Sequence, residues 1–334
     1  MAAGITSSSA TLSTPAPAAA EAPAAAAARP GKAAPDPLEN QPRLQRYLAL
    51  AGPGAAASAE PAASAPGADA DEDAPLRADQ GVVQAWLMLA QSAEQRGDFP
   101  AAEAWLARID DPQRALDVQA RRASLMARQG RIDDAVKSLR QVPERSADDA
   151  RAKLVAEAQL LRDVKRWQAA HDVFERANAR FADDVDLLYE QAMMAEKIDR
   201  IDDMERLLRR VIALKPDHGH AHNALGYSLA DRGLRLTEAR ELIRRALDLR
   251  PGDPFITDSL GWVEFRLGNR DEALRLLRTA WAARPDTEIG AHLGEVLWSL
   301  GRQDEARAIW REARQRDAAN EVLRETLVRL QVGL

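Results

Sequence analysis

The sequence predicts an all-α fold in which helix hairpins stack along the chain as a right-handed α-solenoid. Amphipathic segments recur at an interval of about 34 residues, which is typical of a solenoid of helix pairs. Glycine or alanine recurs at one position in these segments, where two helices can approach closely only if the side chain is small. Glycines and prolines also recur where turns and helix ends are expected.

The stretch 254–285 shows the repeated plan most clearly. Two amphipathic helices are expected on either side of a tight turn at Gly268, because glycine readily adopts the left-handed conformation that ends a helix. Pro285 closes the second helix, which proline cannot continue. The preceding stretch, 219–251, repeats this plan with Gly233 at the turn and a proline at its end.

The first helix of each pair carries one small residue at the expected crossing point, in the order Ala90, Ala123, Ala158, Ala192, Gly226, Gly261 and Gly294. The second helix carries matching alanines, with Met204 as the one departure, at Ala102, Ala135, Ala170, Ala239, Ala273 and Ala306. The turn residues are Gly97, Gly130, Gly233, Gly268 and Gly301, and Arg166 and Asp199 stand in the two turns that lack a glycine. About seven hairpins are therefore expected.

These units resemble tetratricopeptide repeats, whose pattern combines Leu-Gly on the first helix with Ala, a large apolar residue, Ala and then Pro. The expected unit starts lie near Val83, Leu116, Arg151, Val185, Gly219, Pro254 and Thr287. Units two to four depart from the pattern, with polar residues where leucine is expected, at Arg122, Glu157 and Gln191. The resemblance is to the C-terminal repeat region of longer proteobacterial proteins of this family.

The sequence divides into a disordered arm, residues 1–78, and the repeat region, residues 79–334. The arm is rich in alanine and proline, and its apolar residues are too few to offset the entropy of ordering. Within the arm, residues 37–52 allow two interpretations. They are a hydrophobic stretch without function or the remnant of a lost repeat, or they form a short helix that docks on a partner or on the repeat region itself. At the other end, residues 319–330 are expected to form a capping helix, because the end of a stack otherwise exposes apolar surface. In that helix Leu323, Leu327 and Leu330 are expected to cover the last hairpin, while Arg324, Glu325 and Arg329 face water.

Composition excludes several functions. A net charge of -6 disfavours nucleic-acid binding, and the absence of cysteine excludes a thiolate metal site and a disulfide framework. The sequence contains no run of about 18 apolar residues, so it predicts no membrane span. The first residues lack a secretory signal, so the chain as given is expected in the cytoplasm, or in the periplasm if the true N-terminus lies upstream.

No catalytic or cofactor-binding set is expected. The many acidic pairs lie at helix starts, where they complement the helix dipole. His218, His220 and His222 alternate at the start of the fifth unit, so they are either ordinary helix-start residues or a partial metal site without a further ligand nearby in the sequence. His171 and His292 are each expected to be ordinary surface or interface residues.

The resemblance implies that the first helix of each unit lines a concave groove. The expected partner-binding residues of this groove are Asn223, Tyr227, Asp258, Trp262, Phe265, Glu295 and Trp298. Aromatic side chains anchor peptides well, although the same aromatics could instead fill the core between repeats. Acidic and aromatic neighbours argue against a clamp for a C-terminal carboxylate and favour an apolar peptide that carries positive charge.

The sequence therefore predicts a non-catalytic scaffold that binds a protein or peptide partner. An alternative is the interaction module of a larger envelope-assembly or enzyme complex, as a fragment of a longer exported protein. Weak self-association through an uncapped first hairpin is a third hypothesis.

Overall fold

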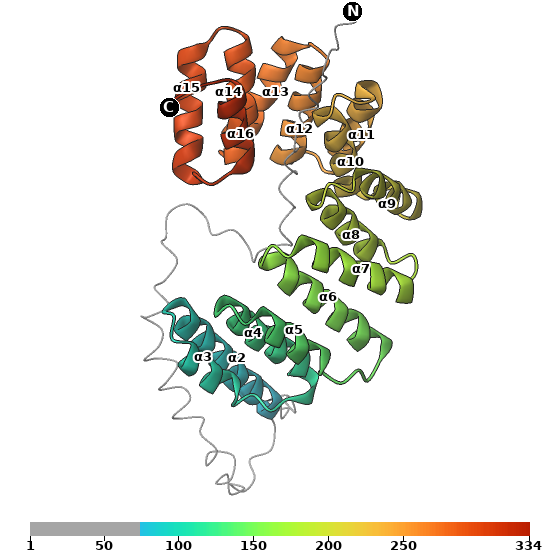
Figure 1. Cartoon of the computed structure of the whole chain (residues 1–334), viewed down its shortest axis with the longest axis vertical. Coiled ribbons are helices and arrows are strands. Elements are labelled where there is room, and N and C mark those ends of the chain that lie inside the picture. The colour runs from blue at the N-terminus through green and yellow to red at the C-terminus, as the bar shows by residue number, and fades with distance from the viewer. Residues whose placement is uncertain (1–73) are drawn as a thin grey trace, which may run out of the picture. The chain divides into compact units, whose positions relative to one another are not determined.

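The computed structural model describes residues 74–334, with side chains described from Gly81 onward. Fifteen α-helices, one short 3₁₀ helix and no strand make up this described part (Figure 1). The first described helix begins at Ala74. The arm expected over residues 1–78 therefore lies almost entirely outside the described residues, and the segment 37–52 lies wholly outside them.

The described chain forms two compact units, which meet in sequence between Arg166 and Trp167. The first contains α2 (Ala74–Gln95), α3 (Phe99–Leu106), η1 (Pro112–Arg114), α4 (Ala115–Arg128), α5 (Ile132–Arg140) and α6 (Ala147–Asp163). The second contains α7 (Trp167–Arg180), α8 (Val185–Lys197), α9 (Ile201–Leu214), α10 (Gly219–Asp231), α11 (Leu236–Leu249), α12 (Pro254–Arg266), α13 (Arg270–Ala283), α14 (Thr287–Ser299), α15 (Gln303–Arg316) and α16 (Glu321–Arg329). Even-numbered helices are called A helices below, and odd-numbered helices are called B helices.

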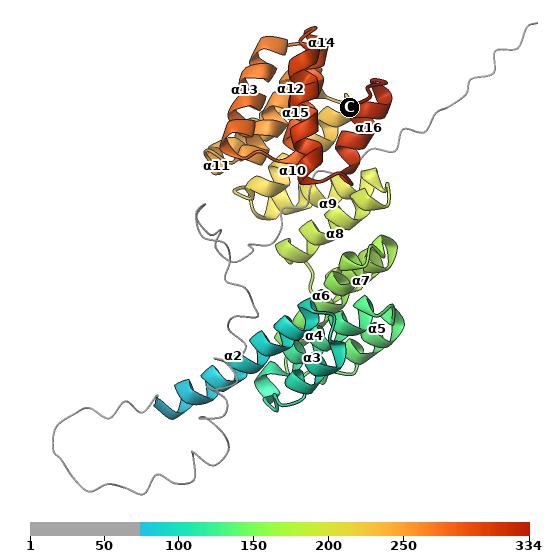
Figure 2. The same cartoon turned by 90° about the vertical axis from the view of Figure 1, so that its left-hand side faces the viewer.

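Each A helix of the second unit packs on the B helix that follows it. The pairs are α8 with α9, α10 with α11, α12 with α13, and α14 with α15, and each B helix also contacts the next A helix up to α14 (Figure 2). In the first unit, α2 packs on α3 and α4 packs on α5. The predicted all-α stack of hairpins is confirmed.

Small residues at the helix crossings are a steric requirement. A Cβ added at Gly261 would lie 2.7 Å from Cγ of Leu277, and one at Gly294 would lie 2.1 Å from Nε1 of Trp310. At Gly226 the same atom would lie 2.6 Å from an α11 side chain. The alanines predicted at the other crossings are buried. Because larger side chains would force the helix axes apart, these residues allow each hairpin to close.

The left-handed residues of the turns lie where the sequence predicts them, with one exception. Positive φ angles occur at the predicted glycines, Gly97, Gly130, Gly233, Gly268 and Gly301. Asp199 takes the glycine position as predicted, with a φ of 60°. The prediction of Arg166 was wrong, because Lys165 has the positive φ, at 58°. The Arg166 N–H instead donates to the Leu161 carbonyl at 2.8 Å, the bond made by the residue that follows the left-handed position.

Polar residues at expected leucine positions are paired inside the stack. Glu157 is 2% exposed, and Arg140 donates to its Oε1 from two nitrogens, at 3.1 and 2.6 Å. Gln191 accepts a hydrogen bond from Asn178 at 2.8 Å and lies 3.4 Å from the ring nitrogen Nε2 of His171. His171, expected at the surface or at an interface, is fully buried beside α8. Polar pairs between neighbouring helices thus replace the leucine contacts, because a buried polar group needs a partner.

The capping helix α16 confirms one prediction and corrects another. Leu323 is buried and Leu327 and Leu330 are partly buried against the core of the last hairpin. Arg329 does not simply face water, because its guanidinium donates to both carboxylate oxygens of Glu295 in α14, at 2.8 and 2.6 Å. The C-terminal helix is therefore attached to the A helices by charge as well as by apolar contact.

Candidate partner-binding site

Corresponding residues of successive A helices form a row across the second unit. The helices α10, α12, α14 and α16 contact one another in that order. The ninth residues of these helices are Tyr227, Trp262, Glu295 and Arg329, which are called the inner row below. Because the hairpins repeat, the row brings together side chains that are far apart in the sequence.

The structure divides the seven predicted groove residues into two groups. Asn223, Phe265 and Trp298 are half-buried, whereas Tyr227, Asp258, Trp262 and Glu295 are buried. The half-buried group offers atoms to a partner directly. The buried group contacts other side chains of the chain itself. A role of either group in partner binding stays a prediction.

A buried polar network connects three A helices. The ring nitrogen Nδ1 of His292 lies 2.9 and 3.1 Å from the two carboxylate oxygens of Asp258. On the other side of the ring, Nε2 lies 3.3 Å from the hydroxyl oxygen of Tyr227. That hydroxyl donates to Glu288 at 3.5 Å. A doubly protonated His292 therefore fits the network, since both ring N–H groups then face acceptors.

Trp262 lies at the centre of the inner row and ties it to this network. Its ring stacks on His292 with centroids 4.4 Å apart, and its indole N–H donates to Asp231 at 3.3 Å. Phe265 packs beside it at 5.4 Å, and the Arg266 guanidinium lies 5.8 Å from the ring centroid. Trp262 is thus a buried support for the surface around Phe265.

The acidic surroundings shift two pKa values. Burial lowers the pKa of His292, but Asp258, Glu288 and Asp231 outweigh that effect and raise it to about 9. Burial raises the pKa of Glu196 from 4.5 to about 8; Lys197 and Arg232 act against this shift, and Glu288 and Asp231 act with it. At neutral pH His292 is therefore charged, and the carboxyl group of Glu196 on α8 is protonated.

Two aromatic side chains form the accessible part of the site. Phe265 and Trp298 are both half-buried and pack against the core of the last hairpin. The Trp298 ring lies 5.7 Å from that of Trp310, and the Arg307 guanidinium lies 5.0 Å from its centroid. In α10, Asn223 has a buried Oδ1 without a hydrogen-bond partner among the described side chains.

The ion pair of Glu295 and Arg329 lies at the end of the inner row. Side-chain exposure is 8% for Glu295 and 50% for Arg329. The hydrogen bond to Glu295 raises the pKa of Arg329, and Asp231 acts in the same direction. A carboxylate of the predicted groove is therefore already bound to a cation of the same chain.

His292 is the central residue that the sequence interpretation missed. It was expected to be an ordinary surface or interface residue; it lies at an interface, where it is 2% exposed and links α14 to α10 and α12 through a polar network that was not expected. The available signal was its spacing of 34 residues from Asp258, which equals the repeat length and places both on A helices. Glu295 and Arg329 have the same spacing.

The three alternating histidines serve the start of α10. His218 caps the helix, with Nδ1 accepting from the Ala221 N–H at 3.0 Å. His222 is buried and its Nε2 lies 3.0 Å from the Pro216 carbonyl oxygen. The His220 ring lies 6.5 Å from that of His218. Two of the rings are thus engaged with nearby backbone.

A partial metal-ligand set occurs elsewhere, on α7. His171, Asp172 and Glu175 each offer one ligand atom, and these atoms lie within 4.8 Å of one another. Asp172 already accepts a hydrogen bond from Gln168 at 2.8 Å, and both acidic residues are exposed. A set of three ligands on one helical turn does not complete a structural site, and we assign no metal to it.

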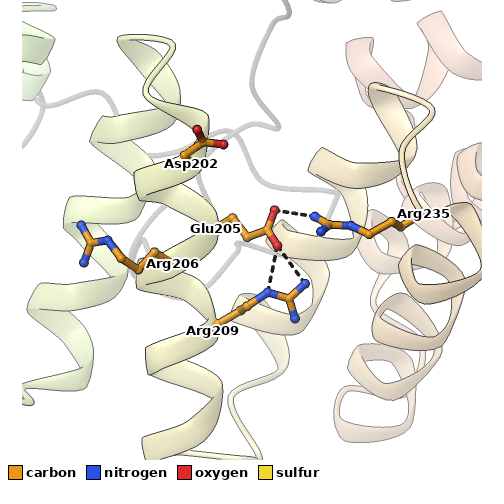
Figure 3. A pocket seen from close by; sticks show the side chains of 5 residues that line it. All are labelled: Asp202, Glu205, Arg206, Arg209 and Arg235. Carbon is orange, nitrogen blue, oxygen red and sulfur yellow. Dashed lines mark hydrogen bonds and ion pairs between the residues drawn. The ribbon is translucent and has the colours of Figure 1, made fainter.

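A depression of about 490 Å³ lies between α9 and α11, lined by Asp202, Glu205, Arg206, Arg209 and Arg235. Figure 3 shows Glu205 between Arg209 and Arg235, and it accepts from them at 2.9 and 2.5 Å. The pair with Arg209 lies within α9 and the pair with Arg235 reaches the start of α11, so the two guanidinium groups are not free to bind an anion. We interpret these side chains as a surface ion-pair network and not as a binding site, and such networks contribute little stability.

Among the described residues, no helix has the length and apolar character that crossing a membrane requires.

Comparison with known proteins supports the repeat assignment. The sequence model described as tetratricopeptide repeat matches residues 73–115, 200–254 and 259–321. A TPR repeat-containing protein of Pseudomonas aeruginosa is 40% identical over 207 residues, which make up 62% of this chain. The chain spans 35% of the length of that relative.

A solved structure shares the fold, and a second is similar over part of the chain. A tetratricopeptide repeat protein from Parabacteroides merdae matches 75% of this chain and 99% of its own, with 13% identity and a TM-score of 0.57. A thermophilic TPR protein of Thermus thermophilus matches 55% of this chain and 100% of its own, with 24% identity and a TM-score of 0.49.

Proposed function

Because this chain is a tetratricopeptide repeat protein, we propose that it is a non-catalytic scaffold that binds a segment of a protein partner along α10, α12 and α14. Repeat proteins of this class act through extended surfaces, but the fold alone does not assign a site. The observation that carries the proposal is the position of two half-buried aromatics, Phe265 on α12 and Trp298 on α14, each three residues after an inner-row residue of its own helix.

The charge of this region indicates the kind of partner. Asp231, Asp258, Glu288 and Glu295 all lie on the A helices of the last three hairpins. Aromatic rings bind apolar side chains and also attract cations over their faces. A segment that combines apolar residues with arginine or lysine is complementary to both features.

The buried His292 is better explained by structure than by catalysis. It pairs with Asp258 as a catalytic base often does, but the two side chains are only 2% and 7% exposed. Its second nitrogen faces Tyr227 at 3.3 Å, where a substrate would have to bind. A general base needs hydrogen-bond contact with the proton that it removes, and this arrangement offers none.

Selection from a displayed peptide library tests the proposal on the purified chain. We expect enrichment of peptides that combine apolar residues with arginine or lysine. Phe265→Ala and Glu295→Gln are expected to reduce capture of the enriched peptides at least tenfold. Leu234→Ala, at an exposed leucine outside the proposed site, is the matched control and is expected to leave capture unchanged. Enrichment of acidic peptides, or equal loss in the control, would contradict the proposal.

A second candidate is an interaction module within a larger envelope-assembly or enzyme complex. The observation that favours it is the length of the Pseudomonas aeruginosa relative, of which this chain spans 35%. Proximity labelling in the native cell distinguishes the candidates. Labelling of one recurrent set of assembly or enzyme subunits supports the module, whereas labelling of unrelated proteins that share only a cationic segment supports the general scaffold.

A further inference from the structure

The ion pair between α14 and α16 has the form of a ligand contact. Both carboxylate oxygens of Glu295 accept from the guanidinium of Arg329, at 2.8 and 2.6 Å. Such two-point pairs are among the strongest and most directional contacts between a protein and an arginine. The buried Glu295 therefore has the geometry of a receptor for arginine, and an arginine of this chain occupies it.

The capping helix packs on α14 and is also influenced by a charge on α10. Asp231, at the end of α10, contributes to raising the pKa of both Glu325 and Arg329 in α16. Asp231 also accepts from the indole of Trp262, so the charge that acts on α16 lies at the inner row. The helix thus lies beside the surface that the proposed function assigns to a partner.

The attachment of α16 combines one favourable and one unfavourable charge. Arg329 is attracted by Glu295, and Asp231 also favours its charged form. The negative charge of Glu325 is disfavoured, because burial and the like charges of Glu321 and Asp231 raise its pKa, although Arg324 and Arg329 lower it in part. Docking of the helix therefore combines the ion pair of Arg329 and Glu295 with apolar contact to the last hairpin.

The helix is also short. It spans Glu321–Arg329, with Val322 and Leu323 buried against the last hairpin, Leu327 partly buried beside them, and Val328 78% exposed. Helices of this length are marginal by themselves, and terminal elements open more readily than the core of a fold. An equilibrium between docked and undocked α16 is consistent with these features.

We infer that α16 is a resident occupant of the partner site, in which Arg329 takes the place of a cationic side chain of the partner. The inference rests on the proposed function and adds how partner binding at that site is regulated. A partner that carries arginine competes with Arg329 for Glu295, and its apparent affinity is reduced by the fraction of chains in which α16 is docked.

The test uses the full chain and a fluorescein-labelled peptide of three alternating leucine and arginine pairs, with binding followed by fluorescence anisotropy. Arg329→Ala is expected to bind the peptide about tenfold more tightly than the unsubstituted chain, because the competitor is gone. Arg324→Ala removes an exposed arginine from the same helix and is expected to bind like the unsubstituted chain. Circular dichroism checks that each variant keeps its helical content.

Hydrogen exchange of residues 321–329 supplies a second measurement. Peptide binding to the unsubstituted chain is expected to accelerate exchange in this segment, as α16 undocks. Glu295→Gln also releases the helix, so its exchange rises without the peptide, but the variant loses the receptor carboxylate and does not bind more tightly. Faster exchange confined to residues 321–329, without tighter peptide binding, distinguishes loss of the Glu295 carboxylate from unfolding of the whole chain.

Two outcomes overturn different statements. If the unsubstituted chain and Arg329→Ala bind the peptide equally and exchange of 321–329 does not rise, the role of α16 is refuted while the proposed function stands. If neither chain binds the peptide while a peptide of alternating leucine and glutamate does bind, the partner chemistry of the proposed function is refuted as well.

Discussion

Gly294 lies against the indole of Trp310, and a Cβ at position 294 would fall 2.1 Å from the ring nitrogen Nε1. That nitrogen donates to the carbonyl oxygen of Ala291, one turn earlier in α14, at 3.2 Å. Trp310 is fully buried, so the ring has no space into which it can move. The crossing of the last hairpin thus depends on this glycine.

Gly294→Ala is expected to destabilise the second unit by about 3 kcal/mol, the upper end of the usual cost of overpacking a core. The measurement is urea unfolding followed by circular dichroism. Gly333→Ala is the control, because a Cβ there would meet no atom within 4 Å. Equal stability of the two variants would show that the helices separate at little cost.

Lys165→Gly is expected to stabilise the chain by about 1 kcal/mol, since lysine at a φ of 58° carries steric strain that glycine lacks. Asp199→Gly is expected to increase stability by a smaller amount, because aspartate adopts the left-handed conformation more readily than lysine. Thermal unfolding of the two variants gives the ranking. A loss of stability in Lys165→Gly would contradict the assignment of strain to that turn.

Asp258→Asn is expected to destabilise the chain by about 3–5 kcal/mol at pH 7, because it leaves a buried charged histidine without its counter-ion. The pKa of His292 in the folded chain, about 9, lies above its ordinary value of 6.5. Its contribution to stability is therefore complete below pH 6.5 and is lost as the pH rises to about 9. Urea unfolding across this range is expected to show the decline in the unsubstituted chain and a smaller decline in the variant.

Glu196→Gln is expected to change the pH dependence of stability at lower pH. Burial raises the pKa of Glu196 from 4.5 to about 8, so the folded chain holds a proton that unfolding releases. Between these two pH values stability falls by at most about 1.4 kcal/mol per pH unit from this group. Glutamine cannot titrate, so the variant is expected to have a flatter profile over pH 4.5–8. An unchanged profile would place Glu196 in contact with water.

Lys165 shows where prediction from sequence loses precision. The turn was recognised from the repeat interval, but the left-handed residue was placed at Arg166 because neither position has a glycine. Which residue turns is decided by the last hydrogen bonds of α6, in which the Arg166 N–H reaches the Leu161 carbonyl. Where a glycine was present, as at Gly268, the position was predicted correctly.

The sequence by itself determined the class of fold, the helix crossings and most turns of this protein. Each of those features depends on residues within one hairpin, where steric size and backbone preference act over short distances. Only the tertiary structure decided which inner-face residues are buried and which charges meet. The pairs of Asp258 with His292 and of Glu295 with Arg329 join successive repeats, and their distance depends on how each hairpin rotates against the next. That rotation results from the packing of whole helices, and no short sequence pattern encodes it.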